Sequence, residues 1–294
     1  MVNRMGFIGG SDVAAALGMS RWKSPLQLWA EKTGEVEPTD LSEVEAVQLG
    51  TELEDFVAKK FEKKTGLKVR RAPKDYIHPN FDYMRCQVDR LIEGRDELLE
   101  CKTCSAWKAK EWDGEDIPQE YIIQVMWQLG VTGRSVGYIA VLIGGQSFKH
   151  KRIDFDQKLF DMLKDGVIAF WDMVQSKTAP MAMGLDNGTI QGLFPTSDET
   201  MQEVEDLNQT IAYLQETKMH IKEMEKEKAE IEAKIKQRIG ENLGVKTSEY
   251  VVKWSNQNRA SIDTARMKED GAYEKYKKIT PMRVLRVRNT GGSK

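Results

Sequence analysis

Two carboxylates and an amine on neighbouring strands are the side chains of this chain best suited to chemistry. Glu100 and Lys102 stand two apart in the stretch ELLECKT, and side chains two apart on a strand leave the same face. Asp89 lies upstream across a short turn, so residues 86–92 and 97–103 are predicted to pair as a hairpin that brings Asp89 to that face. Such a set can hold a hard divalent cation and position a water beside it.

The alternative interpretation of these residues is a hairpin exposed to solvent, with no functional role, because Asp, Glu and Lys are common on surfaces. The sequence around them argues against it. Leu98 and Leu99 lead into Glu100, which indicates a strand buried within a sheet. A charged side chain on a buried strand is costly unless it is paired or bound to metal.

Two flanking helices offer further polar side chains. Glu54 lies on a predicted helix upstream and supplies a third carboxylate. Tyr121 and Gln124 lie three apart on a predicted helix downstream, and Gln128 follows one turn later. Taken alone, each of these patterns also fits an ordinary half-exposed helix.

The order of predicted elements is helices, strands, a helix, a strand and a helix, which indicates an α/β core with a mixed sheet. The expected helices are residues 10–18, 26–33, 41–65, 118–130 and 157–176, with a short helix or loop at 107–112. A strand-rich block at 68–103 and strands at 136–143 and 152–155 complete this core.

The composition changes after this core. Residues 179–196 are rich in Gly, Pro and Asn and are predicted to be a linker or irregular loop between a domain at 1–178 and a second one at 197–294. A charged helix with coiled-coil-like spacing is expected at 197–241. A small α/β unit follows, with strands at 250–255 and 282–287 and a helix at 263–276.

Composition and net charge indicate the cellular compartment of the protein and the way in which it could bind nucleic acid. The net charge is −2, so the chain has no overall positive charge that would attract nucleic acid. Any surface that binds nucleic acid must therefore be a local basic patch. Three cysteines are too few for a disulfide framework and fit a reducing cytosol. No apolar run suggests a signal peptide or a membrane span, so we expect a cytoplasmic protein that does not bind membranes.

Three other chemistries have little support in the sequence. Cys101-x-x-Cys104 has no second Cys or His pair at zinc-ligand spacing, and three cysteines cannot hold a four-cysteine iron–sulfur cluster. The three histidines are scattered. No GxxxxGK[ST] loop is present, so ATP hydrolysis is not expected.

Four blocks in order resemble the YqaJ-type viral recombinase nucleases, relatives of lambda exonuclease in the PD-(D/E)XK superfamily. They are RMGFIGGSDVAAALGMSRWKSPLQLWAEKTG, QLGTELEDFVAKKFEKKTG, the hairpin from Asp89 to Lys102, and PQEYIIQVMWQLGVTG. Together they span roughly residues 4–155. The leading Pro of the superfamily motif is absent, because Gln87-Val88 precede Asp89, but that Pro is not a ligand. The resemblance implies a restriction-endonuclease-like core, to which the long helix and the small α/β unit are added.

The resemblance also implies roles for particular residues. Asp89, Glu100 and the backbone carbonyl of Cys101 would hold Mg²⁺, for which Mn²⁺ would substitute. Lys102 would orient or deprotonate the attacking water and stabilise charge on the phosphate. Glu54 would support the site through a second metal ion or its water shell. A further pair would act beside them, with Gln124 contacting the water or Lys102 and Tyr121 packing alongside.

Other residues of the sequence match family positions that contact DNA. Arg4 and Ser11 match family positions that recognise a 5′-phosphate, although Ser11 also fits a plain helix N-cap and Arg4 an ordinary surface cation. Arg21 and Lys108 lie beside tryptophans and are candidates for the DNA track. For the tryptophans the alternative is a place in the core, which we favour for Trp22 and Trp29 but not for Trp107 or Trp112.

The sequence therefore predicts a Mg²⁺-dependent nuclease, foremost a 5′→3′ exonuclease acting on double-stranded DNA ends. The resemblance implies a single-strand annealing protein as partner in phage or prophage recombination, and a homo-oligomer that forms a trimeric ring in processive members. One alternative is an endonuclease or structure-specific nuclease on the same core. Another is a DNA-binding or partner-recruiting protein that works through its C-terminal arm.

Overall fold

The computed structural model describes residues 5–72, 75–280 and 282–288. The chain divides into two compact units, Met1–Phe194 and Pro195–Lys294, and each is considered by itself. Across the described ranges, no helix is both long enough and apolar enough to cross a membrane.

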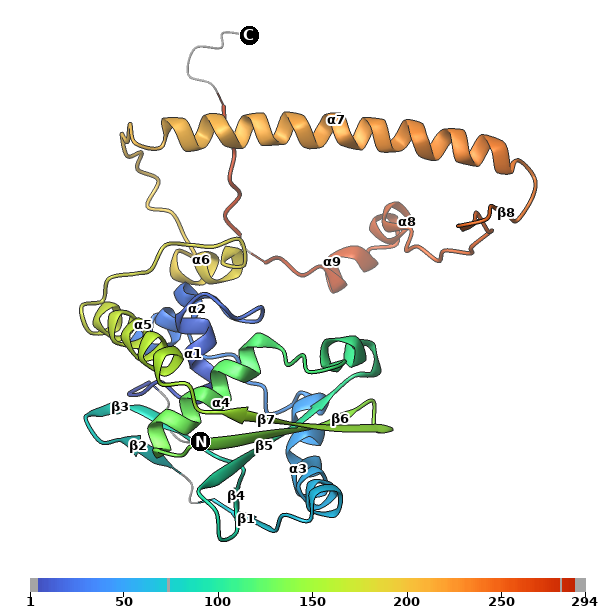
Figure 1. The fold of residues 1–294 in the computed structure, drawn as a ribbon. Coiled ribbons are helices and arrows are strands. Elements are labelled where there is room, and N and C mark those ends of the chain that lie inside the picture. Colours follow the sequence, from blue (N-terminus) through green and yellow to red (C-terminus); the bar gives the residue numbers. More distant parts are fainter. Residues whose placement is uncertain (1–4, 73–74, 281, 289–294) are drawn as a thin grey trace. The chain divides into compact units, whose positions relative to one another are not determined.

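A mixed five-stranded sheet is the centre of the first unit (Figure 1). The strand order is β1-β4-β5-β6-β7, in which only β5 and β6 pair in parallel. The bounds are β1 (Val69–Arg71), β4 (Arg90–Ile92), β5 (Glu97–Cys104), β6 (Val136–Ile143) and β7 (Ser147–Asp154). Strands β2 (Tyr76–His78) and β3 (Phe81–Cys86) form a separate hairpin. The predicted α/β fold with a mixed sheet is confirmed.

The parallel pairing of β5 with β6 requires a crossover, because a tight turn can join only antiparallel neighbours. The 3₁₀ helix η1 (Ala106–Trp112) and helix α4 (Gln119–Thr132) supply it. Helix α4 starts after Pro118 and ends at Gly133, whose φ of 68° suits glycine. The crossover therefore carries α4 back across the face of the strand that holds Glu100 and Lys102.

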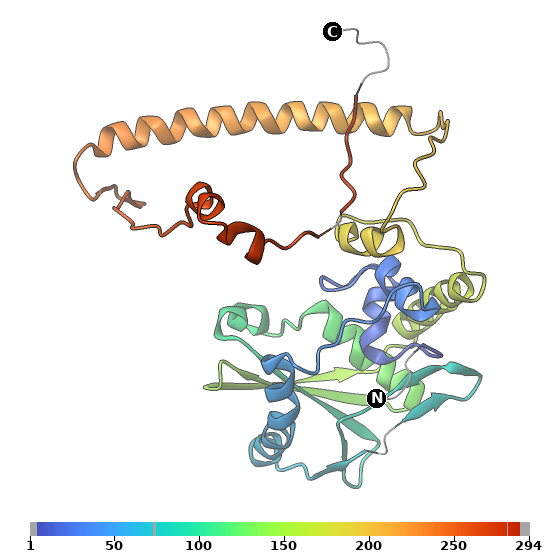
Figure 2. The same cartoon turned by 180° about the vertical axis from the view of Figure 1, so that it is seen from behind.

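The two faces of the sheet have different cores (Figures 1 and 2). Helices α1 (Gly10–Ala16), α2 (Pro25–Thr33), α4 and α5 (Gln157–Gln175) pack on one face, and α3 (Glu45–Thr65) on the other. Leu98 belongs to the larger core under α4, whereas Leu99 packs with Phe61 of α3. Since side chains alternate along a strand, Glu100 and Lys102 share the α4 face with Leu98.

The predicted Asp89 hairpin needs one correction. Strands β4 and β5 do pair across a turn at Gly94, whose φ is 70°. The first strand, however, does not run from Cys86 to Ile92: β3 ends at Cys86, β4 begins at Arg90, and Asp89 lies in the bend between them. Freed from the ladder, the Asp89 side chain can turn toward a main-chain donor on β5.

The segment 179–196, for which we expected an irregular linker, contains helix α6 (Asn187–Leu193). Asp186 just before it is fully buried, accepts a hydrogen bond from the Ser24 hydroxyl and accepts another from Met183 N at 2.6 Å. These bonds fasten α6 to the start of α2, and the segment as far as Phe194 is part of the first unit. The predicted domain limits themselves are not tested by these contacts.

The second unit contains the predicted long helix, α7 (Asn208–Ile239), which starts eleven residues later than Ser197. A hairpin follows, β8 (Gly244–Lys246) with β9 (Val251–Lys253), and then α8 (Thr264–Glu269) and α9 (Ala272–Tyr276). Gly271, with φ of 68°, splits the helix that was expected to be continuous. The strand expected at 282–287 is wrong, because these residues are irregular.

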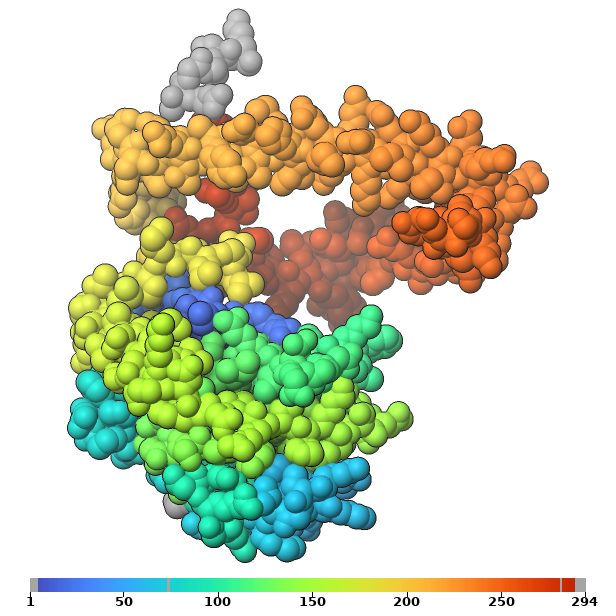
Figure 3. All heavy atoms as spheres, viewed as in Figure 1, coloured from blue at the N-terminus to red at the C-terminus, as the bar shows by residue number. Residues whose placement is uncertain are grey.

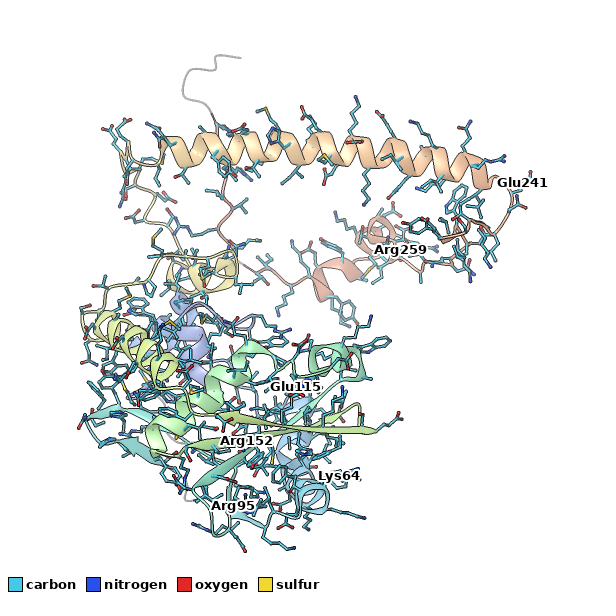
Figure 4. The ribbon with its side chains drawn as sticks, viewed as in Figure 1. Lys64, Arg95, Glu115, Arg152, Glu241 and Arg259 are labelled. Carbon is cyan, nitrogen blue, oxygen red and sulfur yellow. The ribbon has the colours of Figure 1, made fainter. Side chains whose placement is uncertain are left out.

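Side chains project from helix α7 along its whole length in Figure 4, and Figure 3 shows the same face of the helix as spheres. Its predicted apolar spacing leaves Ile221, Met224 and Ile231 at least half exposed. A coiled-coil partner for this stripe stays a prediction.

One buried arginine joins α3 to the sheet. The Arg90 side chain is 5% exposed, and its guanidinium pairs with Glu54 and Asp55 of α3. Its Nη1 also donates to the main-chain oxygen of Asp89 at 2.6 Å. Burial alone would lower the pKa of Arg90, but the hydrogen bond and charge of Glu54 outweigh it and raise this pKa. The arginine therefore fixes both α3 and the bend at Asp89.

Replacing Arg90 by Met should lower the free energy of unfolding of the first unit by about 1–3 kcal/mol, because Glu54, Asp55 and the Asp89 main-chain oxygen lose the buried guanidinium that joins them. The matched control is Arg71→Met. Arg71 bonds the same Asp55 at 2.8 Å, but its side chain is 74% exposed, so about 0–1 kcal/mol is expected. Denaturant unfolding followed by tryptophan fluorescence measures both; equal losses would contradict a special role for Arg90.

The close approach of α4 and α5 gives a second prediction. A Cβ at Gly130 would stand 2.1 Å from the Phe160 ring, so Gly130→Ala should destabilise by about 1–3 kcal/mol despite the better helix propensity of Ala. Gly50 of α3 is the control, since its added Cβ would meet only Thr103 Oγ1 at 3.5 Å. Gly50→Ala should gain up to about 1 kcal/mol. Thermal unfolding that ranked the two in reverse order would refute this packing.

Candidate active site

The buried carboxylate of Glu100 is the centre of the candidate site. The residue is 3% exposed on the α4 face of β5. Its Oε1 accepts a hydrogen bond from Gln124 Nε2 at 2.6 Å and contacts Lys102 Nζ at 2.6 Å. Its Oε2 accepts from Gln128 Nε2 at 2.7 Å. Both oxygens are therefore held by donors on α4 and on its own strand.

Lys102 joins the same group of side chains. Its Nζ donates to Gln124 Oε1 at 3.0 Å and lies 5.2 Å from the centre of the Tyr121 ring. Burial would lower the pKa of Lys102, but the carboxylates of Glu100 and Asp89 outweigh it and raise this pKa. The lysine is therefore an ammonium that carries positive charge into a largely buried site.

Asp89 completes the predicted trio from the opposite side of the hairpin. Its Oδ2 accepts a hydrogen bond from the Cys101 main-chain N–H at 2.8 Å. Burial, and then the charge of Glu100, raise the pKa of Asp89 to about 8. Two carboxylates held this close repel each other, and a cation between them would relieve that repulsion.

Gln128 has a place in the site that we did not predict. It is 1% exposed, and its Nε2 donates both to Glu100 and to the main-chain oxygen of Gln87 at 2.9 Å. It thereby ties Glu100 to the segment just before Asp89. The available signal was its position one turn after Gln124, on the helix face that meets the strand.

Glu54 lies beside the group rather than within its hydrogen bonds. Its carboxylate is paired with Arg90, next to Asp89 in the chain. It is close enough for its charge to contribute to the raised pKa of Asp89. Arg90 was also missed by the sequence analysis, because an arginine next to an aspartate at the start of a strand resembles a solvated side chain.

A cavity of about 380 Å³ opens onto these carboxylates. Its lining includes Asp89, Glu100, Gln124 and Ser11. Arg85 also lines it and brings a cation that the sequence analysis did not single out. The structure therefore brings Ser11 to the same cavity as Asp89 and Glu100, while Arg4 lies outside the described residues.

A buried ion pair between Asp12 and Lys32 holds the turn that carries Ser11. Asp12 Oδ2 accepts from Gly9 N at 3.1 Å and pairs with Lys32 Nζ at 2.9 Å. The same Nζ donates to the Phe7 main-chain oxygen at 2.7 Å. Helix α1 starts at Gly10 with Gly9 as its N-cap, so Ser11 lies inside the first turn and the plain N-cap interpretation of Ser11 is wrong.

The basic and aromatic candidates lie around η1. Arg21 is 2.8 Å from Glu120 and 3.1 Å from Glu111, so its guanidinium joins two carboxylates. Lys108 lies 4.4 Å from the centre of the Trp22 ring. Trp22 is 66% exposed, so the core position expected for it is wrong, whereas that of Trp29, at 6%, is confirmed.

Trp112, which was a candidate for the DNA track, is buried instead. It is 1% exposed and stacks on Tyr121 with ring centres 5.6 Å apart, so it cannot line a DNA track. Tyr121 packs between this indole and Lys102. Stacking on the buried Trp112 therefore holds the Tyr121 ring beside Lys102, where it was expected to pack.

The donor atoms suit a hard cation. Asp89, Glu100 and the main-chain carbonyl of Cys101 offer oxygen only, which Mg²⁺ prefers. In the part of the chain that the structure describes, no three His, Cys, Asp or Glu side chains gather as a metal site. A cation bound here would therefore take its remaining ligands from main-chain oxygen and water, as Mg²⁺ does in many enzymes.

Comparisons with known proteins show the family of this chain. Residues 2–135 match the model of the YqaJ-like viral recombinase domain. The uncharacterized protein YqaJ of Bacillus subtilis (strain 168) is 37% identical over 302 residues, covering 96% of this chain and 91% of its own.

Solved structures share the fold of the first unit. An alkaline exonuclease from Laribacter hongkongensis, LHK-Exo, superimposes with a TM-score of 0.51 at 22% identity, over 59% of this chain and 90% of its own. The same enzyme in complex with dAMP gives a TM-score of 0.51 at 24% identity, with the same coverage. With the match to the family model and a relative that aligns along nearly its whole length, this chain belongs to the YqaJ-like viral recombinase family.

Proposed function

We propose that this protein is a Mg²⁺-dependent deoxyribonuclease, a 5′→3′ exonuclease that resects linear duplex DNA. The observation that carries the proposal is the grouping of Asp89, Glu100 and Lys102: both carboxylates line one cavity, and Gln124 is bonded to both Glu100 and Lys102. Membership of a viral recombinase family and the exonuclease fold support it.

In this proposal Asp89, Glu100 and the Cys101 carbonyl hold the ion. When bound, Mg²⁺ would lower the pKa of a water and offset charge on the phosphate. Lys102 orients that water and donates to the phosphate oxygen on which charge develops. Gln124 holds the ammonium and the carboxylate at fixed separation, so the site is organised before DNA arrives. Glu54 acts through Arg90 on the bend at Asp89.

The 5′ end of the DNA would be recognised at the other side of the cavity. Ser11 offers a hydroxyl there, and Arg85 offers a charge that a phosphate requires. For Arg4, which lies outside the described residues, the role in 5′-phosphate recognition that the resemblance implies is kept as part of the proposal. Resection from a 5′ end leaves a 3′ strand, which a single-strand annealing protein would bind in phage or prophage recombination. The homo-oligomer is part of the same proposal.

Lys102→Ala should lower the cleavage rate by about 100-fold or more, because a charge aimed at the transition state is lost. The assay is Mg²⁺-dependent digestion of linear duplexes labelled at the 5′ or the 3′ end, beside a closed circle. We expect early release of the 5′ label from linear DNA only.

Lys64→Ala is the matched control, since this lysine lies on α3 away from the cavity (Figure 4) and should leave the rate unchanged. Cutting of the closed circle would replace the proposed exonuclease by an endonuclease. Undiminished cleavage by Lys102→Ala would show that the site is assigned wrongly.

Gln128→Leu should weaken metal binding by roughly 10-fold or more, because Glu100 loses the donor that ties it to Gln87. Calorimetric titration of the DNA-free protein with Mn²⁺ measures this directly. Gln119→Leu, at an exposed position of the same helix, should leave the affinity unchanged. Equal affinities in all three proteins would exclude Gln128 from the support of the metal ligands.

A further inference from the structure

Two tryptophans near the candidate site face solvent. Trp107 is 95% exposed and Trp22 is 66% exposed. Indole side chains at such exposure contribute little to folding, since the burial that would stabilise them is missing. Their exposure is therefore better explained by a ligand than by the core.

The loop that carries Trp22 is held in place. Ser20 Oγ accepts hydrogen bonds from Trp22 N at 3.1 Å and from Lys23 N at 3.3 Å. Next to it, Arg21 bridges Glu111 of η1 and Glu120 of α4. The loop, η1 and the first turn of α4 are thus joined, so the Trp22 ring is presented with little freedom left to lose on binding.

The same bridge places this surface next to the chemistry. Glu120 precedes Tyr121, whose ring lies under Lys102. Trp112, at the end of η1, stacks on that Tyr121 ring. A strand that leaves the Glu100 cavity along α4 would therefore meet η1 and the Trp22 loop.

Charge at this surface favours a polyanion with aromatic groups. Lys108 Nζ lies over the Trp22 ring, where it can contact a phosphate while the indole face stacks. Lys110 of η1 is also exposed. The nearby carboxylates of Glu111 and Glu120 are paired with Arg21, which reduces their repulsion of phosphates. Bases inside a duplex stack on one another, so only unpaired bases can offer their faces to an indole.

We propose that Trp22, Trp107 and Lys108 form a stacking platform for unpaired nucleobases of a DNA strand that leaves the cleavage site. Arg21 acts as the brace of this platform rather than as a phosphate ligand. This inference rests on the proposed nuclease function, but it concerns binding of bases and is testable without cleavage.

The experiment compares two tails of equal charge. The full chain in EDTA is titrated onto a fluorescent duplex that bears a single-stranded tail of roughly ten nucleotides, made either of thymidines or of abasic spacers. Tails on either strand are measured by anisotropy. We expect the thymidine tail to bind at least about 5-fold more tightly, because stacking needs bases while phosphate contacts do not.

Variants separate the two contributions. Trp107→Ala should remove most of the preference for thymidine, and Lys108→Met should weaken both tails by similar factors. Trp254→Ala, a 51% exposed tryptophan of the second unit, should change neither. Trp107 is so exposed that its loss should leave folding intact.

Equal affinity of the wild type for both tails, or an unchanged preference in Trp107→Ala, would overturn the platform. Failure of the nuclease proposal has a different signature, which is absence of Mg²⁺-dependent cleavage of any DNA by the wild type. A tail preference without cleavage would support the platform and refute the nuclease, and the reverse result would do the opposite.

Discussion

A carboxyl group that is 3% exposed, as that of Glu100 is, must find in its surroundings the hydrogen-bond partners that water would otherwise supply. Lys102 supplies charge, and the amides of Gln124 and Gln128 supply donors. Each of these neighbours is itself positioned by a larger element, β5 or α4. The need of the buried Glu100 side chain for hydrogen-bond donors therefore determines which face of the sheet α4 must cover. It also determines which residues α4 must present there.

The alternation of a strand made part of the site predictable from the sequence. Glu100 and Lys102 had to share a face, and the apolar pair Leu98-Leu99 showed that the strand was buried, so the fold and the central group followed from local pattern. Asp89 was harder to place, because a bend that ends one strand and starts another has no periodic signal. Its displacement from the ladder depends on a donor on β5 and on Arg90, both contacts made through tertiary structure.

Side chains that bridge elements were the least predictable part. Arg90 and Gln128 each connect segments far apart in sequence, and their residue types fit an ordinary surface equally well. Trp22 and Trp112 were interchanged for a similar reason: an indole has no sequence signal for burial, and only the course of η1 decides which ring packs on Tyr121. Residues 282–287 are mostly apolar and yet irregular, because apolar composition alone does not make a strand.

The parallel pairing of β5 with β6 has a consequence for the order in which the chain folds. The β6–β7 hairpin is local and needs no other element, whereas the eight register pairs between β5 and β6 can form only after η1 and α4 have crossed over. Glu100 acquires its amide donors in that same step. Until it is complete, the carboxylates remain hydrated and mobile, so a nascent or partly folded chain has no organised candidate site before its core has closed.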